Sequence, residues 1–96
     1  MGIVPNSQTR KAIEKVRFGG VAIYGNKKEW CLYHVGNIYR ITHYGTAIVD
    51  VTEDGTVTLL RGYSASDRDN INSLTLLLLG KKVCRMKNWR LVRTDE

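Results

Sequence analysis

The feature that most constrains this chain is a series of short apolar segments separated by glycine-containing turns. VAIY (21–24), EWCLYHV (29–35) and NIYRITHY (37–44) are rich in β-branched and aromatic residues and are bounded by turn residues, which is typical of strands. TAIVDVTEDGTVTLLRG (46–62) has the same pattern around an Asp-Gly pair and predicts a further hairpin. Connections this short join antiparallel neighbours, so the sequence predicts a β-meander.

Two hairpin turns determine the expected register. Gly36-Asn37 is a two-residue turn with glycine first, and it would place Tyr33 opposite Arg40. A two-residue loop at Asp54-Gly55 would mix apolar and polar side chains on each face, whereas the three-residue loop 53–55 separates the faces. We therefore expect the three-residue loop. It gives the following pairs: Val51 with Val57, Asp50 with Thr58, and Val49 with Leu59.

Two segments change to the helical period. SQTRKAIEKVRFGG predicts a short N-terminal helix over about residues 8–18, capped by Ser7 or Thr9 and ended by a glycine pair. An amphipathic helix is predicted over about residues 66–79 and ends at Gly80. The expected buried faces are Ala12, Ile13, Val16 and Phe18 on the first helix, and Ile71, Leu74, Leu77 and Leu78 on the second.

A polar cluster, GYSASDRDNIN (62–72), opens the second helix and contains hydroxyl, carboxylate and guanidinium groups. Ser64 or Ser66 can accept hydrogen bonds from the free N–H groups of a helix start, and aspartates are favoured there by the helix dipole. A catalytic serine would need a neighbouring base, and neither histidine is close in sequence. Asp67 and Asp69 would repel a phosphate group. The cluster is therefore interpreted as a helix cap.

The C-terminal segment, KKVCRMKNWRLVRTDE (81–96), predicts a last hairpin with a tight turn at Lys87-Asn88. This turn would place apolar residues on one face of the ribbon and arginines on the other. The expected pairs are Cys84 with Leu91, Arg85 with Arg90, and Met86 with Trp89. Like charges that face each other lower stability, and an anionic partner would offset that effect. Exposed arginines on an edge ribbon also deter aggregation, so both interpretations stay open.

These elements predict an α+β fold. The 66–79 helix packs on one face of an antiparallel meander of about five to seven strands, and the 8–18 helix lies beside it. The whole chain, 1–96, forms a single domain, in which residues 1–6 are expected to be disordered. The longest apolar run, residues 74–79, is far shorter than the ~20 residues of a membrane-spanning helix, so no membrane partner is expected.

Few residues suggest catalysis or metal binding. His34 and His43 fall on one predicted sheet face, where they could bind a metal or share a proton, but histidines more often line the polar edge of a core. Cys31 and Cys84 are expected to be reduced and partly buried. Of four aspartates that could form a nuclease centre, a turn and a helix cap account for all but Asp50. No enzyme, metal or cofactor is therefore expected.

Charge is unevenly distributed along the chain. The net charge is +6, with +5 in residues 1–28, −3 in residues 29–80 and +4 in residues 81–96. If the two basic ends meet on one surface, this pattern gives the protein one strongly positive side, and we expect that the two ends do meet. On the open sheet face, Tyr33 beside Arg40 has the composition of sites that stack single-stranded nucleobases. An anionic partner is therefore expected.

HYGT (43–46), GYSASDRDNIN (62–72) and LLLLG (76–80) together resemble a set of small uncharacterised proteins that bacteriophages and mobile elements encode. The resemblance covers about residues 38–80. It implies a bacteriophage-like origin and a place in the cytoplasm of the host cell. It implies no catalytic residues.

The expected function is binding without catalysis. In the first hypothesis, the protein inhibits a host nucleoprotein machine, as anti-CRISPR proteins do; in the alternative, it binds DNA or RNA directly as an accessory factor. A small-molecule sponge would need an oligomer with a pocket at its interface, and the sequence leaves the oligomeric state open, a dimer included. The residues expected to contact the partner are Lys81, Lys82, Arg85, Lys87, Arg90 and Arg93 near the C-terminus, and Arg10, Lys11, Lys15 and Arg17 near the N-terminus.

Overall fold

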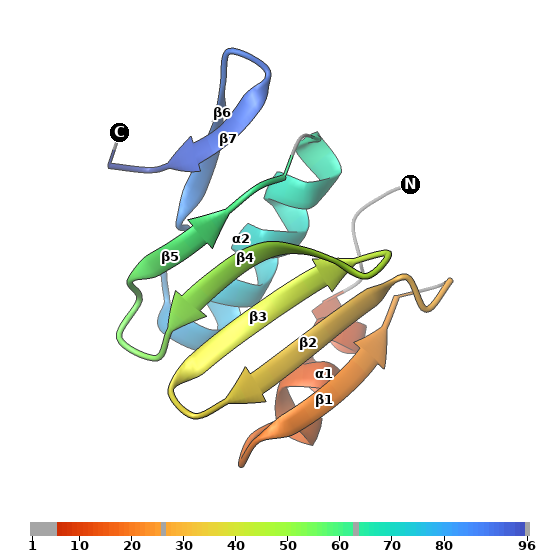
Figure 1. The fold of residues 1–96 in the computed structure, drawn as a ribbon. Coiled ribbons are helices and arrows are strands. Elements are labelled where there is room, and N and C mark those ends of the chain that lie inside the picture. The colour runs from red at the N-terminus through yellow and green to blue at the C-terminus, as the bar shows by residue number, and fades with distance from the viewer. Residues whose placement is uncertain (1–5, 26, 63, 96) are drawn as a thin grey trace.

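The computed structural model describes residues 6–25, 27–62 and 64–95. In chain order, the elements are α1 (Asn6–Lys15), β1 (Gly20–Tyr24), β2 (Trp30–Val35), β3 (Ile38–His43), β4 (Thr46–Thr52), β5 (Val57–Leu60), α2 (Ala65–Leu79), β6 (Cys84–Lys87) and β7 (Arg90–Arg93). Within these residues, β1 to β5 form one antiparallel sheet in sequence order, and β6 and β7 form a separate hairpin (Figure 1). The α+β class and the meander are therefore confirmed. No helix in these ranges is long and apolar enough to cross a membrane.

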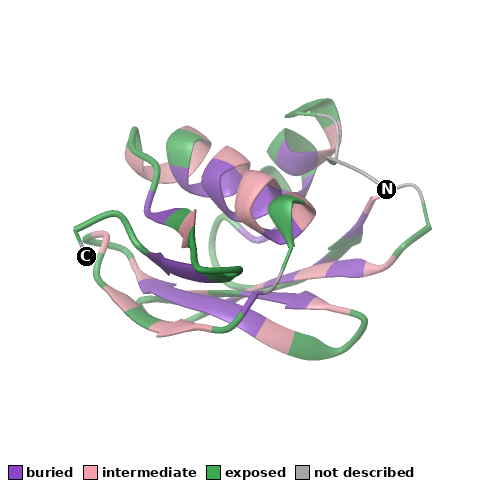
Figure 2. Ribbon diagram, turned by 90° about the horizontal axis from the view of Figure 1, so that it is seen from above, coloured by how far each residue is buried: buried purple, intermediate pink, exposed green. Residues whose placement is uncertain are grey.

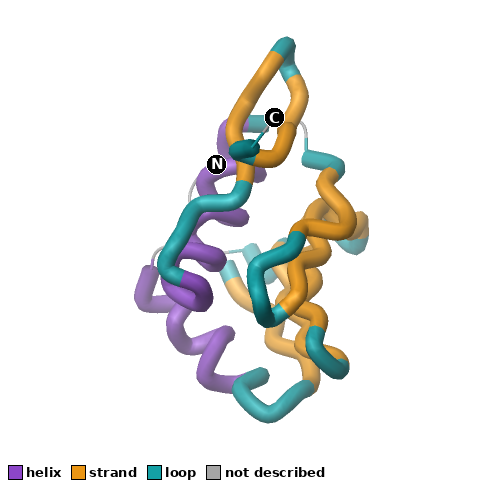
Figure 3. The backbone as a smooth tube through the Cα atoms, turned by 90° about the vertical axis from the view of Figure 1, so that its left-hand side faces the viewer, coloured by secondary structure: helices purple, strands orange, loops and turns teal. Residues whose placement is uncertain are grey.

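Both helices lie on the same face of the sheet. Seen from above, the helices form one layer and the sheet the other, and the buried residues lie between them (Figure 2). A side view shows the same two layers (Figure 3). The largest of the fully buried side chains come from both layers: Thr9, Val16, Leu32, Ile41, Val49, Val51, Ile71, Leu74 and Thr75. Within the described ranges, no layer covers the opposite face of the sheet.

The polar cluster that opens α2 is its cap, as predicted. Of the two candidate serines, Ser64 is the one used: its side chain accepts a hydrogen bond from the backbone N–H of Asp67 at 3.1 Å. At the other end, Gly80 is left-handed (φ 74°), and its N–H donates to the carbonyl of Leu76 at 3.1 Å. A left-handed glycine in this position satisfies a carbonyl that the last helical turn leaves free.

The registers of two hairpins follow from their turns. Tyr33 faces Arg40 across the β2–β3 turn, which confirms the predicted pairing. The β4–β5 loop also has the predicted three residues, because Val51 faces Val57 and Gly55 is left-handed (φ 95°).

Beyond that loop, the predicted β4–β5 pairing is wrong by one residue. The observed pairs are Asp50 with Leu59 and Val49 with Leu60, instead of Asp50 with Thr58 and Val49 with Leu59. Val57 and Leu60 both pack against the core. Residues three apart in a strand share a face only if one extra residue is inserted, so the apolar spacing of β5 requires this bulge.

The N-terminal helix is shifted relative to the predicted 8–18 range. Its first residue is Asn6, so the expected disorder is wrong for that residue, and the expectation for residues 1–5 lies outside the described ranges. Because the helix begins early, neither predicted cap residue caps it: Ser7 and Thr9 both lie inside the helix, and Thr9 is buried.

The apolar stripe of α1 ends at Val16. Phe18 was expected to belong to this stripe, and that expectation is wrong. The N–H of Val16 is shared between the carbonyls of Ala12 and Ile13, both at 3.2 Å, which is a common arrangement at helix ends. The chain then turns into β1, and Phe18 is left 94% exposed, with the guanidinium of Arg17 5.4 Å from its ring centre.

His34 joins α1 to the sheet. Its Nδ1 lies 2.7 Å from the carbonyl oxygen of Val16, and its Nε2 lies 2.9 Å from Oε2 of Glu53. Both partners accept hydrogen bonds, so both ring nitrogens must donate, which only the imidazolium can do. The bond to the Val16 carbonyl raises the pKa of His34 above its ordinary value; burial opposes this effect, and the Glu53 carboxylate adds to it.

His43 joins α2 to the sheet in a similar way. Its Nδ1 lies 3.0 Å from Oδ1 of Asp67, and its Nε2 lies 2.5 Å from Oε2 of Glu29. The ring stacks on Trp30 with centroids 3.9 Å apart and planes within 2°. The two histidines lie at opposite ends of the β2–β3 hairpin, because His34 faces Tyr39 and His43 faces Trp30. They therefore line the polar edge of the core.

The His34 contacts predict a pH-dependent stability. A pKa that is raised by folding stabilises the protein fully below about pH 6.5, and this stabilisation is lost as the pH rises through the folded-state pKa. The free energy of unfolding of the wild type should exceed that of His34→Gln most at about pH 6. By about pH 9 this difference in the free energy of unfolding should be smaller. It should fall by about 1.4 kcal/mol for each pH unit by which the pKa of His34 in the folded state exceeds that in the unfolded state. Urea denaturation at both pH values measures this, and a constant difference would contradict it.

At Gly62, just before α2, there is no room for a larger side chain. A Cβ on this residue would lie 2.4 Å from Cδ1 of Leu91 and 2.9 Å from Cβ of Asp67. Gly62→Ala should therefore lower the free energy of unfolding by about 1–3 kcal/mol in urea denaturation. The matched control is the double variant with Leu91→Ala, which removes one of the two clashes. The double variant should lose less free energy of unfolding than the two single variants lose in sum. If the losses simply add, the clash with Leu91 is not the cause.

Candidate nucleic-acid interface

The C-terminal hairpin turns one residue later than predicted. The turn is Asn88-Trp89, and both residues are left-handed, with φ of 52° and 67°. The observed pairs are Lys87 with Arg90, Met86 with Leu91, Arg85 with Val92, and Cys84 with Arg93. The predicted Lys87-Asn88 turn is therefore wrong. A two-residue turn with two left-handed positions suits asparagine at its first position better than lysine, because asparagine adopts this conformation more readily.

Toward its tip, the β6–β7 hairpin still has basic and apolar side chains on different faces, whereas at its base Val92 lies on the basic face and Arg93 on the apolar one. Residues two apart in a strand share a face, as do cross-strand partners. Arg85, Lys87 and Arg90 therefore project on one side, and Met86 and Leu91 on the other. The predicted like-charge pair of two arginines does not form; the like charges that face each other are Lys87 and Arg90.

A buried asparagine anchors the base of the hairpin on α2. Oδ1 of Asn72 accepts from the backbone N–H groups of Val83 at 3.0 Å and Cys84 at 3.2 Å, and its Nδ2 donates to the Cys84 carbonyl at 2.9 Å. The Cys84 thiol is enclosed in the same region, and burial raises its pKa to about 11. Sequence reasoning missed Asn72, although an amide beside the apolar residues of a helix is a signal for such a contact.

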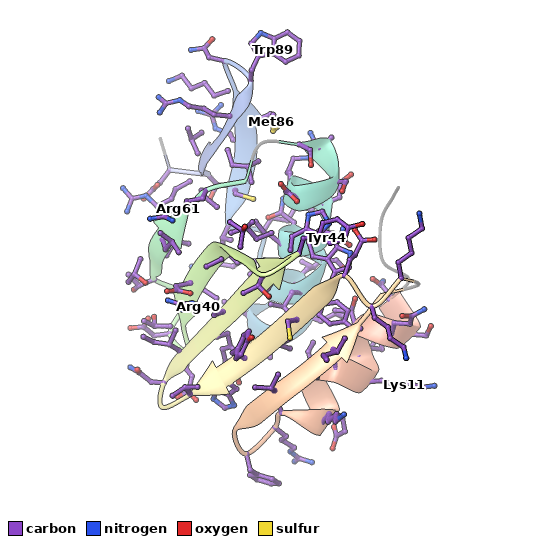
Figure 4. All side chains as sticks on the ribbon, turned by 45° about the vertical axis from the view of Figure 1, so that its right-hand side comes forward. Lys11, Arg40, Tyr44, Arg61, Met86 and Trp89 are labelled. Carbon is purple, nitrogen blue, oxygen red and sulfur yellow. The ribbon has the colours of Figure 1, made fainter. Side chains whose placement is uncertain are left out.

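Trp89 is the most unusual residue of the hairpin. It lies at the tip, 92% exposed, and its side chain points away from the body of the protein (Figure 4). A bulky residue with positive φ is a conformational outlier. A recess of about 640 Å³ lies beside it, lined by Met86, Lys87 and Asn88 of the hairpin and by Ser64 and Ala65 at the start of α2. The tip thus combines an exposed indole with basic side chains.

The other predicted C-terminal contacts lie at the base of the hairpin. Lys81 and Lys82 line a recess of about 290 Å³ beside the β4–β5 turn, together with Arg93. Arg93 also forms an ion pair with Asp95 at 3.5 Å. These three residues are therefore separated from the tip by the length of the ribbon.

The two basic ends do not form one surface, and that expectation is wrong. The sheet order places β1 at one edge, with α1 behind it, and β5 at the other edge, beside which the β6–β7 hairpin protrudes (Figure 1). The N-terminal basic residues therefore lie far from the hairpin. They are Arg10, Lys11, Lys15 and Arg17, of which Arg17 pairs with Glu14 at 3.3 Å.

On the open sheet face, the guanidinium of Arg40 is not free. Arg40 forms a two-pronged ion pair with Asp50, with Nε–Oδ1 at 2.7 Å and Nη2–Oδ2 at 2.8 Å. Tyr33 lies beside Arg40 as predicted, and both line a recess of about 520 Å³ with Val35 and Ile38. Because the guanidinium is neutralised, this face is a weak candidate for binding phosphate.

The aspartates are dispersed, and each has a local partner. Asp50 pairs with an arginine, Asp67 with His43 and Asp69 with Arg68, while Asp54 accepts a hydrogen bond from Thr52 in the β4–β5 turn. In the described ranges, no group of three or more histidine, cysteine, aspartate or glutamate side chains is placed to hold a metal ion. The exposed tip of the β6–β7 hairpin is thus the best candidate interface.

Comparisons with known proteins assign this chain to no family. No protein-family model, no curated protein and no solved structure matches it. The resemblance of residues 38–80 to bacteriophage-encoded proteins stays a prediction.

Proposed function

We propose that this protein is a binding protein without catalytic activity, and that its β6–β7 hairpin contacts nucleic acid, either bare or exposed in a nucleoprotein. The observation that carries this proposal is the exposed Trp89 at the tip of the hairpin, directly beside the Lys87–Arg90 pair. The shape supports it too, because a two-stranded β-ribbon fits the major groove of B-DNA.

The chemistry of the tip suits a polyanion with flat bases. Lys87 and Arg90 can neutralise phosphates and release bound counterions. An indole offers a flat surface on which any base can stack, and such stacking contributes about 1–3 kcal/mol per base. Arg85 projects on the same face and extends the basic strip toward the base of the ribbon.

Two features of the tip lower the stability of the free protein. The left-handed backbone of Trp89 costs about 1–2 kcal/mol, and the like charges of Lys87 and Arg90 repel each other across the ribbon. Outliers of this kind cluster at functional sites. An anionic partner would relieve the repulsion and would use the exposed indole.

A second candidate function is inhibition of a host nucleoprotein machine by a bacteriophage-encoded protein acting in the host cytoplasm. It is favoured by the open sheet face, where Val21, Ile23, Val35 and Ile38 are exposed. Exposed apolar patches mark protein interfaces, and nucleic acid makes little use of them. In this case the hairpin would touch the nucleic-acid site of the machine while the sheet face docks on its protein.

Reversing one charge at the tip should change stability and binding in opposite directions. Lys87→Glu creates an ion pair with Arg90, so the free energy of unfolding should rise by about 0.2–1 kcal/mol. Binding to short DNA and RNA oligonucleotides in a gel-shift salt series should weaken, and the salt slope should fall by about one.

The matched control is Arg10→Glu, which makes the same charge change at the opposite end of the molecule and should leave binding nearly unchanged. If both variants lost the same oligonucleotide affinity, binding would depend on the net charge alone and not on the hairpin. If the wild type shifts no oligonucleotide even at low salt, direct binding is excluded. A stoichiometric complex with a host nucleoprotein that survives moderate salt would then support inhibition.

Trp89 gives a second test, because the other tryptophan, Trp30, is buried. Adding single-stranded oligonucleotide should quench the emission of Trp89 if bases stack on it. Trp89→Gly should abolish the quenching and weaken binding, while it raises the free energy of unfolding by about 1–2 kcal/mol because glycine adopts the left-handed conformation without strain. Unchanged affinity in this variant would contradict a stacking role.

A further inference from the structure

β1 is an outer strand of the sheet and offers an open edge. It is hydrogen-bonded to β2 alone among the described strands, so its outward backbone groups have no partner strand. Proteins usually protect such edges with charged residues, prolines or a covering segment. The strand sequence, GVAIY, contains neither a charged residue nor a proline. A further strand can therefore pair with it.

The two sides of this edge differ in chemistry. On the open sheet face, Val21 and Ile23 are 45% and 61% exposed. On the helical side, a cleft of about 240 Å³ lies between α1 and β1, and its basic lining is Lys11, Lys15 and Lys28. Lys11 extends from α1 beside β1 (Figure 4). The edge thus separates an apolar side from a cationic one.

The sequence of α1 produces the cationic side. Gln8, Lys11 and Lys15 recur at helical spacing and line the same cleft. Oε1 of Gln8 accepts a hydrogen bond from the backbone N–H of Gly25 at 2.9 Å, which ties the start of α1 to the end of β1. The lysines are therefore held along the strand edge.

We propose that β1 accepts an extended segment of a partner protein as a sixth strand of the sheet, and that this segment alternates apolar and acidic residues. Side chains of an added strand point alternately to the two faces of the sheet. Those on the open face would contact Val21 and Ile23, and those on the helical face would meet Lys11 and Lys15. The main-chain ladder provides affinity, and the alternation provides specificity.

The chemistry of the edge disfavours other occupants. A nucleic acid would meet the lysines but would form no ladder with the strand and would leave Val21 and Ile23 exposed. A second copy that paired β1 with β1 would bring two α1 helices together, and the lysines of each would repel the other. The proposal is independent of the β6–β7 hairpin, which lies at the other end of the protein.

The test uses a fluorescent peptide of about eight residues in which glutamate alternates with valine. Anisotropy should show saturable binding to the full chain. Binding should be lost for a peptide with the same residues in two blocks and for one with lysine in place of glutamate. N-methylation of the amides that face β1 should abolish binding, whereas methylation of the outward amides should preserve it. Equal binding of the block peptide, or of both methylated peptides, would overturn strand addition.

Protein variants locate the site. The double variant Lys11→Glu/Lys15→Glu should weaken peptide binding by about tenfold or more, because each reversal replaces attraction by repulsion. Lys87→Glu/Arg90→Glu makes the same charge change on the hairpin and should leave peptide binding unchanged, which separates this proposal from the one for nucleic acid. Melting curves establish that both variants are folded.

Val21→Lys/Ile23→Lys should weaken binding from the apolar side of the same edge. If an oligonucleotide rather than the peptide binds in a manner that depends on Lys11 and Lys15, the proposal fails. It also fails if sedimentation shows a dimer that the Val21→Lys/Ile23→Lys variant dissociates, because the edge would then belong to a second copy.

Discussion

The arrangement of this protein depends on two imidazole rings that attach both helices to one face of the sheet. His34 bonds the carbonyl at the end of α1, and His43 bonds a carboxylate in the first turn of α2. Each ring has an acceptor on both sides, so neither can turn without breaking a hydrogen bond that is at least partly buried. Because both attachments use the same face, neither helix covers the other face of the sheet.

Much of this fold could be predicted from local patterns. The short apolar segments between turns predict the meander, and Ser64 and Gly80 mark the ends of α2 because their roles depend only on neighbouring backbone groups. The bulge in β5 was predictable in principle from the spacing of Val57 and Leu60. The sequence did not distinguish between two registers of the last hairpin, because both separate apolar from basic side chains near the tip. Only the left-handed preference of Asn88 favours the observed register.

The placement of the basic residues could not be predicted, because it depends on topology rather than on local pattern. A meander in sequence order puts the first and fifth strands at opposite edges, and the segments that precede and follow the sheet go with them. The basic groups at the two ends of the chain are therefore separated. This turns one expected surface into two: an aromatic, basic tip on the hairpin and a lysine-lined strand edge beside α1.

The anchorage of the hairpin through Asn72 has a consequence for how recognition can evolve. One amide holds the backbone at the root of the ribbon, and Met86 and Leu91 pack against the core. The residues of the tip itself, 87–90, are all exposed. Length and composition at the tip are thus released from the demands of folding. A lineage that carries this scaffold can exchange its tip for a new target while the two-layer body remains the same.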